Sequence, residues 1–188
     1  MQGRDNTLDA DLIEQVRRGN RAAFGKLVEP HLPRLLGLAR RMLGTGEDAE
    51  DALQNALAST WVARARLDPG KPVAAYLTAV TLNKCRDRLR RRKVARLLGF
   101  GALDPQIPVA ADQPDTESAV ADRQALDTVS RAIDGLPVRL REALVLVAIE
   151  GRSQGEVAGL LGTTEKAIET RVYRARQRLR EKYDLFEG

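Results

Sequence analysis

The sequence predicts an all-α protein: two small helical domains joined by a flexible linker, with a helix-turn-helix in the C-terminal domain. Three observations lead to this prediction. Most apolar residues in the chain of 188 recur at helical spacing, and no stretch alternates as a strand would. A segment rich in glycine, proline and aspartate interrupts that spacing. Residues 153–179 form a short helix, a tight turn and a longer basic helix.

We place the first domain at residues 8–95, the acidic flexible linker at 96–117 and the second domain at 118–183. No Lys or Arg occurs from Leu97 to Asp122. Glycine and proline interrupt this segment and its apolar residues follow no sustained period, so it is expected to be a flexible linker. Its composition fits a passive tether between the two domains.

The first domain is expected to hold four helices. Asp9 or Asp11 can cap a first helix that ends near Gly19. The next apolar run, residues 24–43, contains Pro30 and Pro33, which should kink or divide it. Residues 47–66 form a third helix with an acidic start and a basic end, in agreement with the helix dipole. After an Asp-Pro-Gly turn, a fourth helix should run from residue 72 to about residue 93.

The helix-turn-helix rests on local signals. Ser153 and Glu156 have the spacing of a capping box. Gly162 can take the positive φ that the turn needs, and Thr163 can cap the second helix. In that second helix one apolar stripe is expected to pack inward, formed by Ile168, Val172, Ala175 and Leu179. The opposite face is basic, which favours DNA binding over the other interpretation, an ordinary helical hairpin with a solvated surface.

The charge distribution points to a polyanionic partner. Lys and Arg number 31 against 26 Asp and Glu, a net charge of +5. The positive residues cluster in RDRLRRRK at 86–93 and again at 171–182, on either side of the acidic segment. Two basic clusters predict two separate contacts with nucleic acid. The alternative is that each cluster is only a solvated helix surface.

Several classes of function are not expected. With Cys85 and His31 as the single cysteine and histidine, the sequence offers no disulfide pair and no Cys/His metal cluster. We therefore expect no metal, no cofactor and no enzymatic activity. The polar start is unlike a signal peptide, and no run approaches the ~20 apolar residues of a membrane span. A soluble, cytoplasmic protein without membrane contact of its own is expected.

Both domains carry motifs of a known family. In the first domain these are Asp48-Ala49-Glu50-Asp51, Trp61, Asp68-Pro69-Gly70, Tyr76, Asn83 and the basic run from Arg86 to Lys93. In the second domain the motif is GLPVRLREALVLVAIEGRSQGEVAGLLGTTEKAIETRVYRARQRLREK. In these residues the chain resembles the extracytoplasmic-function (ECF, group 4) sigma factors of the sigma-70 family. The resemblance covers residues 8–95 and 118–183.

The resemblance implies three sets of binding residues. Core RNA polymerase would be contacted by Asp48, Asp51, Gln54 and Asn55, the last standing where the family commonly has Glu. The −10 promoter element would be bound by Tyr76, Asn83, Arg86, Asp87, Arg90 and Arg91, with help from the loop at residues 66–71. The −35 element would be bound by Lys166, Glu169, Thr170, Arg171 and Arg174.

These residue types suit promoter opening, which breaks no covalent bond. An amide such as that of Asn83 can read the edge of a flipped base, and arginines can hold phosphates. For Trp61 plain core packing is the favoured interpretation, while Tyr76 is equally compatible with packing and with base contact. Glu169 departs from the usual Lys or Arg, so it either accepts from a cytosine amino group or points away.

The implied partners are core RNA polymerase, promoter DNA and an anti-sigma factor, in a setting of regulated stress response. Three other functions compete with this one. The first is a helix-turn-helix repressor or activator that acts without core polymerase. The others are an enzyme that acts on DNA and an adaptor that binds polymerase but not DNA.

Overall fold

The structure is a computed structural model that describes residues 2–44, 46–98 and 128–184, and within these ranges it is helical with no strand. The first domain runs through α1 (Gln2–Arg17), α2 (Arg21–Val28), η1 (Glu29–His31), α3 (Leu32–Leu43), α4 (Gly46–Val62), η2 (Arg64–Arg66) and α5 (Val73–Leu97). The second contains helical residues 128–134, then α7 (Val138–Leu144), the π-helical turn η3 (Val145–Ile149), α8 (Gln154–Leu161) and α9 (Glu165–Asp184). The all-α prediction is confirmed.

Local signals explain the breaks between the first helices. The chain leaves α1 at Gly19, whose φ is +91°, and the Asn20 side chain caps α2 by accepting a hydrogen bond from the backbone N–H of Ala23. Pro30 and Pro33 lie in η1 and at the start of α3, so the predicted division of this segment is confirmed. Proline lacks the N–H that a continuous α-helix would need there.

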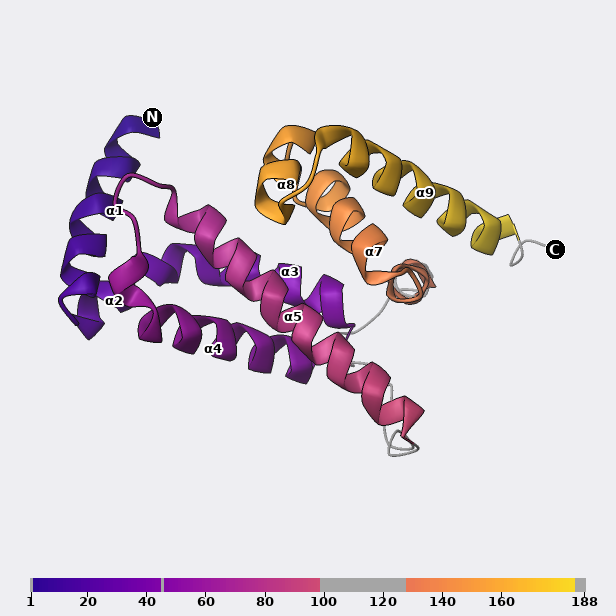
Figure 1. Ribbon diagram of the computed structural model, residues 1–188, viewed down its shortest axis with the longest axis horizontal. Helices are drawn as coiled ribbons and strands as arrows, with labels where there is room; N and C mark the ends of the chain where they lie inside the picture. The colour runs from indigo at the N-terminus through magenta and orange to yellow at the C-terminus, as the bar shows by residue number, and fades with distance from the viewer. Residues whose placement is uncertain (1, 45, 99–127, 185–188) are drawn as a thin grey trace, which may run out of the picture.

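Helices α3, α4 and α5 form the body of the first domain, and α5 extends beyond it (Figure 1). The turn from α3 to α4 begins at Gly44, which has φ +77°. Near the start of α4, the buried Asp48 carboxylate forms ion pairs with Arg88 and Arg92 of α5. This pairing ties α4 to the middle of α5.

The second domain has the helix-turn-helix that the sequence predicts. The capping box of Ser153 and Glu156 is present, and Gly162 ends α8 with φ +61°. The prediction that Thr163 caps the next helix is wrong. The backbone N–H of Thr163 donates to the carbonyl of Ala158, so this residue takes part in the C-terminal cap of α8. Thr164 is the cap, because its hydroxyl accepts a hydrogen bond from the N–H of Ala167 at 3.2 Å.

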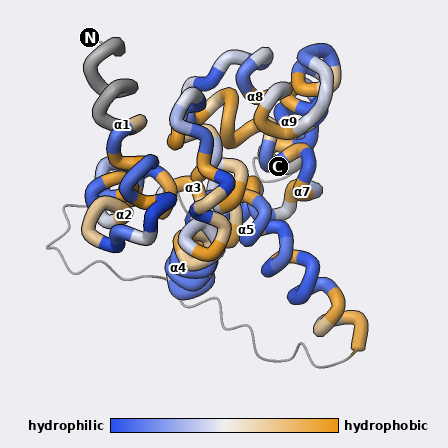
Figure 2. The backbone as a smooth tube through the Cα atoms, turned by 60° about the vertical axis from the view of Figure 1, so that its left-hand side comes forward, coloured by the Kyte–Doolittle hydropathy of each residue, from blue (hydrophilic) through white to orange (hydrophobic). Residues whose placement is uncertain are grey.

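Of the three hydrophobic clusters of buried residues in the described part of the chain, two involve the first domain. One lies within the first domain, from Ile13 of α1 to Leu77 of α5. The other crosses between the domains, joining Met42 and Leu82 of the first domain to Val145 and Ile168 of the second. Figure 2 shows the hydrophobic positions turned mainly toward the contacts between helices. In the structure the two domains therefore pack directly on each other.

The predicted linker lies outside the described residues from position 99 onward. Helix α5 continues to Leu97, one residue past the expected start of the linker, and Leu97 and Leu98 are exposed. The domain boundaries at 95 and 118 stay predictions. Among the described helices, none is both long and apolar enough to cross a bilayer.

Candidate nucleic-acid interface

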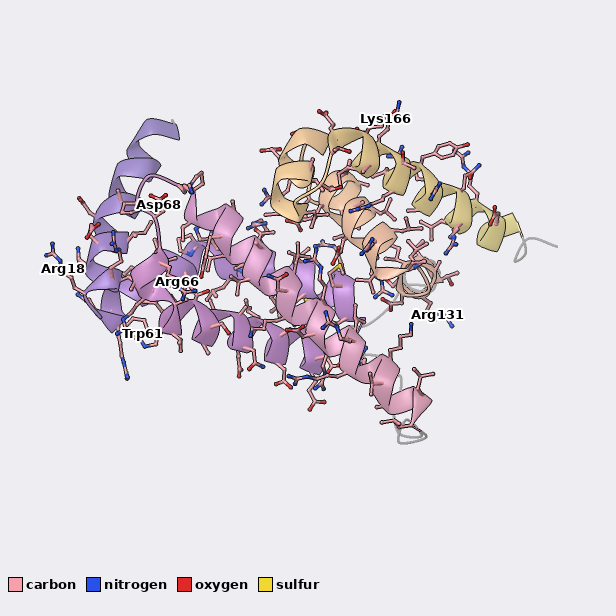
Figure 3. The ribbon with its side chains drawn as sticks, in the orientation of Figure 1. Arg18, Trp61, Arg66, Asp68, Arg131 and Lys166 are labelled. Carbon is pink, nitrogen blue, oxygen red and sulfur yellow. The ribbon has the colours of Figure 1, made fainter. Side chains whose placement is uncertain are left out.

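One basic surface lies on α9. Lys166, Glu169, Thr170 and Arg174 are exposed there, and Arg171 is half-buried. Lys166 projects outward from the start of α9 (Figure 3). On the other side of the helix Ile168, Val172 and Ala175 are buried, which confirms the predicted apolar stripe. The stripe fixes α9 against α7 and α8, so the basic side faces away from the domain.

The side chains on this surface are suited to reading a DNA groove. Lys166, Thr170 and Arg174 follow each other at intervals of four residues, so they lie along one face of α9. The Thr170 hydroxyl donates to the carbonyl of Lys166 at 2.8 Å, which turns it back onto the helix. The arginines can form paired hydrogen bonds with guanine, and the helix is narrow enough for the major groove.

A second polar surface runs along α5. Tyr76 is half-buried at the start of this helix and packs against the first-domain cluster. Asn83, Asp87 and Arg90 lie on the same side of the helix as Tyr76, at spacings of seven, four and three residues, and all three are exposed. Arg91 is exposed on the adjoining face. The helix thus presents an aromatic ring, an amide and several charges in a line.

Arg86 occupies a different environment from the rest of the α5 set. Its guanidinium donates through Nε and Nη2 to the carboxylate of Glu142 in α7, with the Nη2–Oε2 distance at 3.0 Å. Its Nη1 donates to the Asn83 side-chain oxygen at 2.8 Å. Glu142 is only 2% exposed, and its hydrogen bonds raise the pKa of Arg86. The second domain therefore holds one of the predicted −10 residues.

The predicted polymerase-binding residues separate into two environments. Asp51, Gln54 and Asn55 are exposed together on the outer face of α4, where the Asn55 amide donates to the carbonyl of Asp51 at 2.7 Å. Asp48 lies apart from them, buried and paired with the arginines of α5 described above. Asp48 in this conformation supports the helix packing and offers little surface to a partner.

Further polar contacts cross between the domains, and no local sequence pattern indicates them. Glu150 after η3 forms ion pairs with Arg34 at 3.2 Å and with Arg41 at 3.4 Å, both on α3. Arg141, buried in α7, donates to the carbonyl of Met42 at 2.5 Å. Burial lowers the pKa of Arg141. Its nearby carboxylate is Asp134, whose own pKa is raised by burial.

In the described part of the chain, the cysteine is buried and the acidic residues form no metal cluster. Cys85 is buried between the domains, and burial raises its pKa to about 12, so it stays a thiol at neutral pH. Within the described ranges, no group of three or more His, Cys, Asp or Glu side chains is arranged to hold a metal ion.

Comparisons with known proteins match both halves of the chain. Residues 27–94 match the family model of sigma-70 region 2, and residues 126–179 match that of sigma-70 region 4. The RNA polymerase sigma factor CnrH of Cupriavidus metallidurans is 39% identical over 93% of this chain and 94% of its own length. The ECF sigma factor SigM of Mycobacterium tuberculosis is 36% identical over 94% of this chain and 85% of its own. The chain belongs to the ECF sigma factors of the sigma-70 family.

Solved structures of this family share the fold. The structure of CnrH in complex with the cytosolic domain of CnrY matches with a TM-score of 0.68 and 33% identity, covering 95% of this sigma factor and 98% of that chain. The sigma factor RpoE of Bartonella quintana, in a complex with the anti-sigma factor NepR, matches with a TM-score of 0.66 and 26% identity. It covers 84% of this chain and 94% of its own.

Proposed function

We propose that this sigma factor binds core RNA polymerase and directs it to promoters through two DNA contacts, acting in the cytoplasm and without catalysis of its own. The observation that carries the proposal is the presence of two basic helical surfaces, on α9 and on α5, in domains that match regions 4 and 2 of the family. Two surfaces on separate domains suit the two separated elements of a bacterial promoter.

Helix α9 would read the −35 element as duplex DNA. Arg171 and Arg174 would contact guanines or the adjacent phosphates, and Lys166 and Thr170 would position the helix on the backbone. Lys166, Thr170 and Arg174 are exposed on the side of α9 opposite its buried stripe, and Arg171 is half-buried. The exposed set supports this role. Glu169, exposed between them, would accept a hydrogen bond from a cytosine amino group.

Helix α5 would hold the −10 element in its opened form. The exposed Asn83 amide would read the edge of an unstacked base, with Tyr76 and Asp87 on the same face of the helix. Arg90 and Arg91 would bind phosphates. Capture of the base and the phosphates would offset an unstacking cost of a few kcal/mol.

The outer face of α4, with Asp51, Gln54 and Asn55, would dock on the polymerase. In the structure the second domain packs on α5, and we call this the closed arrangement. Arg86 is then bound to Glu142, so it becomes available to DNA only when the second domain moves away from α5. Polymerase binding would separate the two domains and place them at the two promoter elements. Asp48 would then contribute through its support of α4 and α5.

An anti-sigma factor would keep the protein inactive until a stress signal releases it. The relatives CnrH and RpoE have been solved with the cytosolic domain of CnrY and with the anti-sigma factor NepR, respectively. An equivalent partner of this sigma factor would stabilise the closed arrangement, in which the second domain rests on α5.

Run-off transcription with purified core polymerase tests the proposal. Adding this sigma factor to core enzyme should produce transcripts from a matched promoter and not from promoters mutated in either element. Equal output from all templates would contradict it. The alternative function, a repressor or activator that acts without core polymerase, would instead show tight operator binding by the free chain and no gain in transcription.

A further inference from the structure

A cluster of arginines lies at the corner where α1, α2 and η2 meet. We call it the basic corner, and it consists of Arg17, Arg18, Arg21, Arg64 and Arg66. Figure 3 shows Arg18, Trp61 and Arg66 at the same end of the molecule, next to the loop that carries Asp68. The binding roles described so far use the loop at residues 66–71 but none of the other arginines.

Trp61 organises this corner. The guanidinium carbon of Arg64 lies 4.8 Å from the centre of the indole ring, and that of Arg21 lies 5.9 Å from it. The ring of Phe24 packs at 5.4 Å between centroids. Cation–π contacts of this kind hold guanidinium groups in place while leaving donors free for an anion. The predicted core role of Trp61 is thus only part of what this side chain does.

The corner has few negative charges to balance it. Arg17 pairs with Glu14, and Asp68 pairs with Lys71. Arg18, Arg21 and Arg66 are exposed, and within the described part of the chain none of them has a carboxylate at ion-pair distance. This leaves an excess of positive charge on a surface open to solvent.

Helix stability explains some of these charges but not Arg21. Arg17 is the last residue of α1 and Arg18 follows it, so their positive charge suits the helix dipole. Arg21 stands at the first position of α2, where positive charge is unfavourable, and no acidic residue occupies that turn. A side chain that opposes the helix dipole and has no carboxylate partner points to a role in binding an anion.

The position of the corner identifies that anion. Along α5, the basic residues Arg90 and Arg91 lie toward the C-terminal end and Asn83 lies at the centre, while the loop and the basic corner adjoin the start of the helix. A strand held at Arg90 and read at Asn83 would therefore reach the corner after the opened bases. We propose that the basic corner binds phosphates of single-stranded DNA that continues beyond the −10 element. The inference rests on the proposed −10 function of α5.

The test uses holoenzyme, assembled from core polymerase and the full chain, and fork-junction DNA without a −35 element. One fork ends its single strand at the −10 element, a second continues the single strand, and a third continues as duplex. Affinity is measured by fluorescence anisotropy for the wild type, for R18A/R21A and for the control R139A/R180A. The control removes two exposed arginines of the second domain.

We expect the wild type and the control to bind the second fork more tightly than the first. In R18A/R21A this gain in affinity should be smaller by roughly a factor of ten. The salt dependence of binding to the second fork should fall by about 0.7 in log–log slope for each phosphate that the variant no longer neutralises. On both the first and the second fork, the variant holoenzyme should still bind a mutated −10 sequence more weakly than the matched one.

Other outcomes would overturn the inference. Equal weakening of R18A/R21A on the first two forks, no weakening at all, or a gain seen only with the duplex extension would each contradict it. If the wild type fails to distinguish a matched from a mutated −10 sequence on the first fork, the proposed −10 function fails instead. Thermal unfolding of R18A/R21A checks that the two substitutions, both at exposed positions, leave the fold intact.

Discussion

The basic face of α9 and the middle of α5 carry similar side chains but have different neighbours. On α9 Lys166, Glu169, Thr170 and Arg174 are exposed and Arg171 is half-buried, while the fully buried residues lie on the other side of the helix. On α5 one of the predicted residues, Arg86, is held by the buried Glu142 of the second domain. The proposed −35 surface would therefore be free to bind DNA in the closed arrangement, whereas the proposed −10 surface would be complete only when the domains separate. Three predictions test this difference, and a fourth tests the cap of α8.

The largest effect is expected from Glu142→Lys. It replaces an ion pair by two positive charges at a buried position, which costs about 3 kcal/mol and should separate the domains. The radius of gyration from small-angle X-ray scattering should rise, while Glu181→Lys, at an exposed position, should leave it unchanged.

Alkylation of Cys85 gives a second measure of the same separation. Burial raises the pKa of this thiol to about 12. A raised thiol pKa adds stability that is complete below its ordinary value of 9.0 and is lost as the pH rises toward 12. The wild type should therefore resist iodoacetamide at pH 8 and Glu142→Lys should react. Unchanged size and reactivity in Glu142→Lys would contradict the closed arrangement.

Arg171→Ala should weaken binding to −35 duplex by about 2 kcal/mol, because it removes a candidate contact to a base or phosphate. Since the basic face of α9 is accessible in the closed arrangement, the loss of binding free energy should be equal in the wild-type and Glu142→Lys backgrounds. Anisotropy with labelled duplex measures both, with Arg139→Ala as the control. A loss that depends on the background would mean that α9 is also covered.

Asn83→Ala should weaken binding of holoenzyme to an opened −10 fork by about 1.5 kcal/mol, because the amide no longer reads the base. It should affect closed duplex much less. Lys84→Ala, the neighbouring position, provides the control. Permanganate footprinting of open complexes reports the same step, and equal losses on fork and duplex would remove Asn83 from the opening step.

The smallest effect is expected from Ser153→Ala, which removes the cap of α8 and costs about 1 kcal/mol of stability. Hydrogen bonds from Ser153 lower the pKa of Glu156. A lowered carboxyl pKa gives stability that is present above its ordinary value of 4.5 and is lost as the pH falls. The destabilisation should thus shrink on acidification, as chemical denaturation can show, with Ser130→Ala as the control. A constant difference across pH would contradict the reciprocal cap.

Local features of the fold were predictable because their causes lie within a few residues. The capping box of α8, the glycine turn, the proline break before α3 and the buried stripe of α9 all follow from neighbouring side chains. The misplaced cap at Thr163 shows the limit of this reasoning. Two adjacent threonines offer equivalent caps, and only the backbone path after Gly162 selects Thr164.

Contacts between distant segments were not predictable in the same way. Glu142 and Arg86 are separated by 56 positions, and nothing in either segment alone indicates that they meet. Asp48 has the appearance of an exposed carboxylate near a helix start, and its burial arises from the approach of α5. The family resemblance supplied the candidate residues, but only the packing shows which of them are available to a partner.

Gly44, at the end of α3, lies against Asp134 of the second domain. A Cβ at this position would collide with the carboxylate of Asp134, and the positive φ of Gly44 already disfavours any other residue. An added methyl group would therefore push Asp134 away from Arg141. It would also weaken the packing of the two domains on each other. A strain carrying Gly44→Ala would then express its target genes without waiting for the inducing signal, as a constitutive allele does.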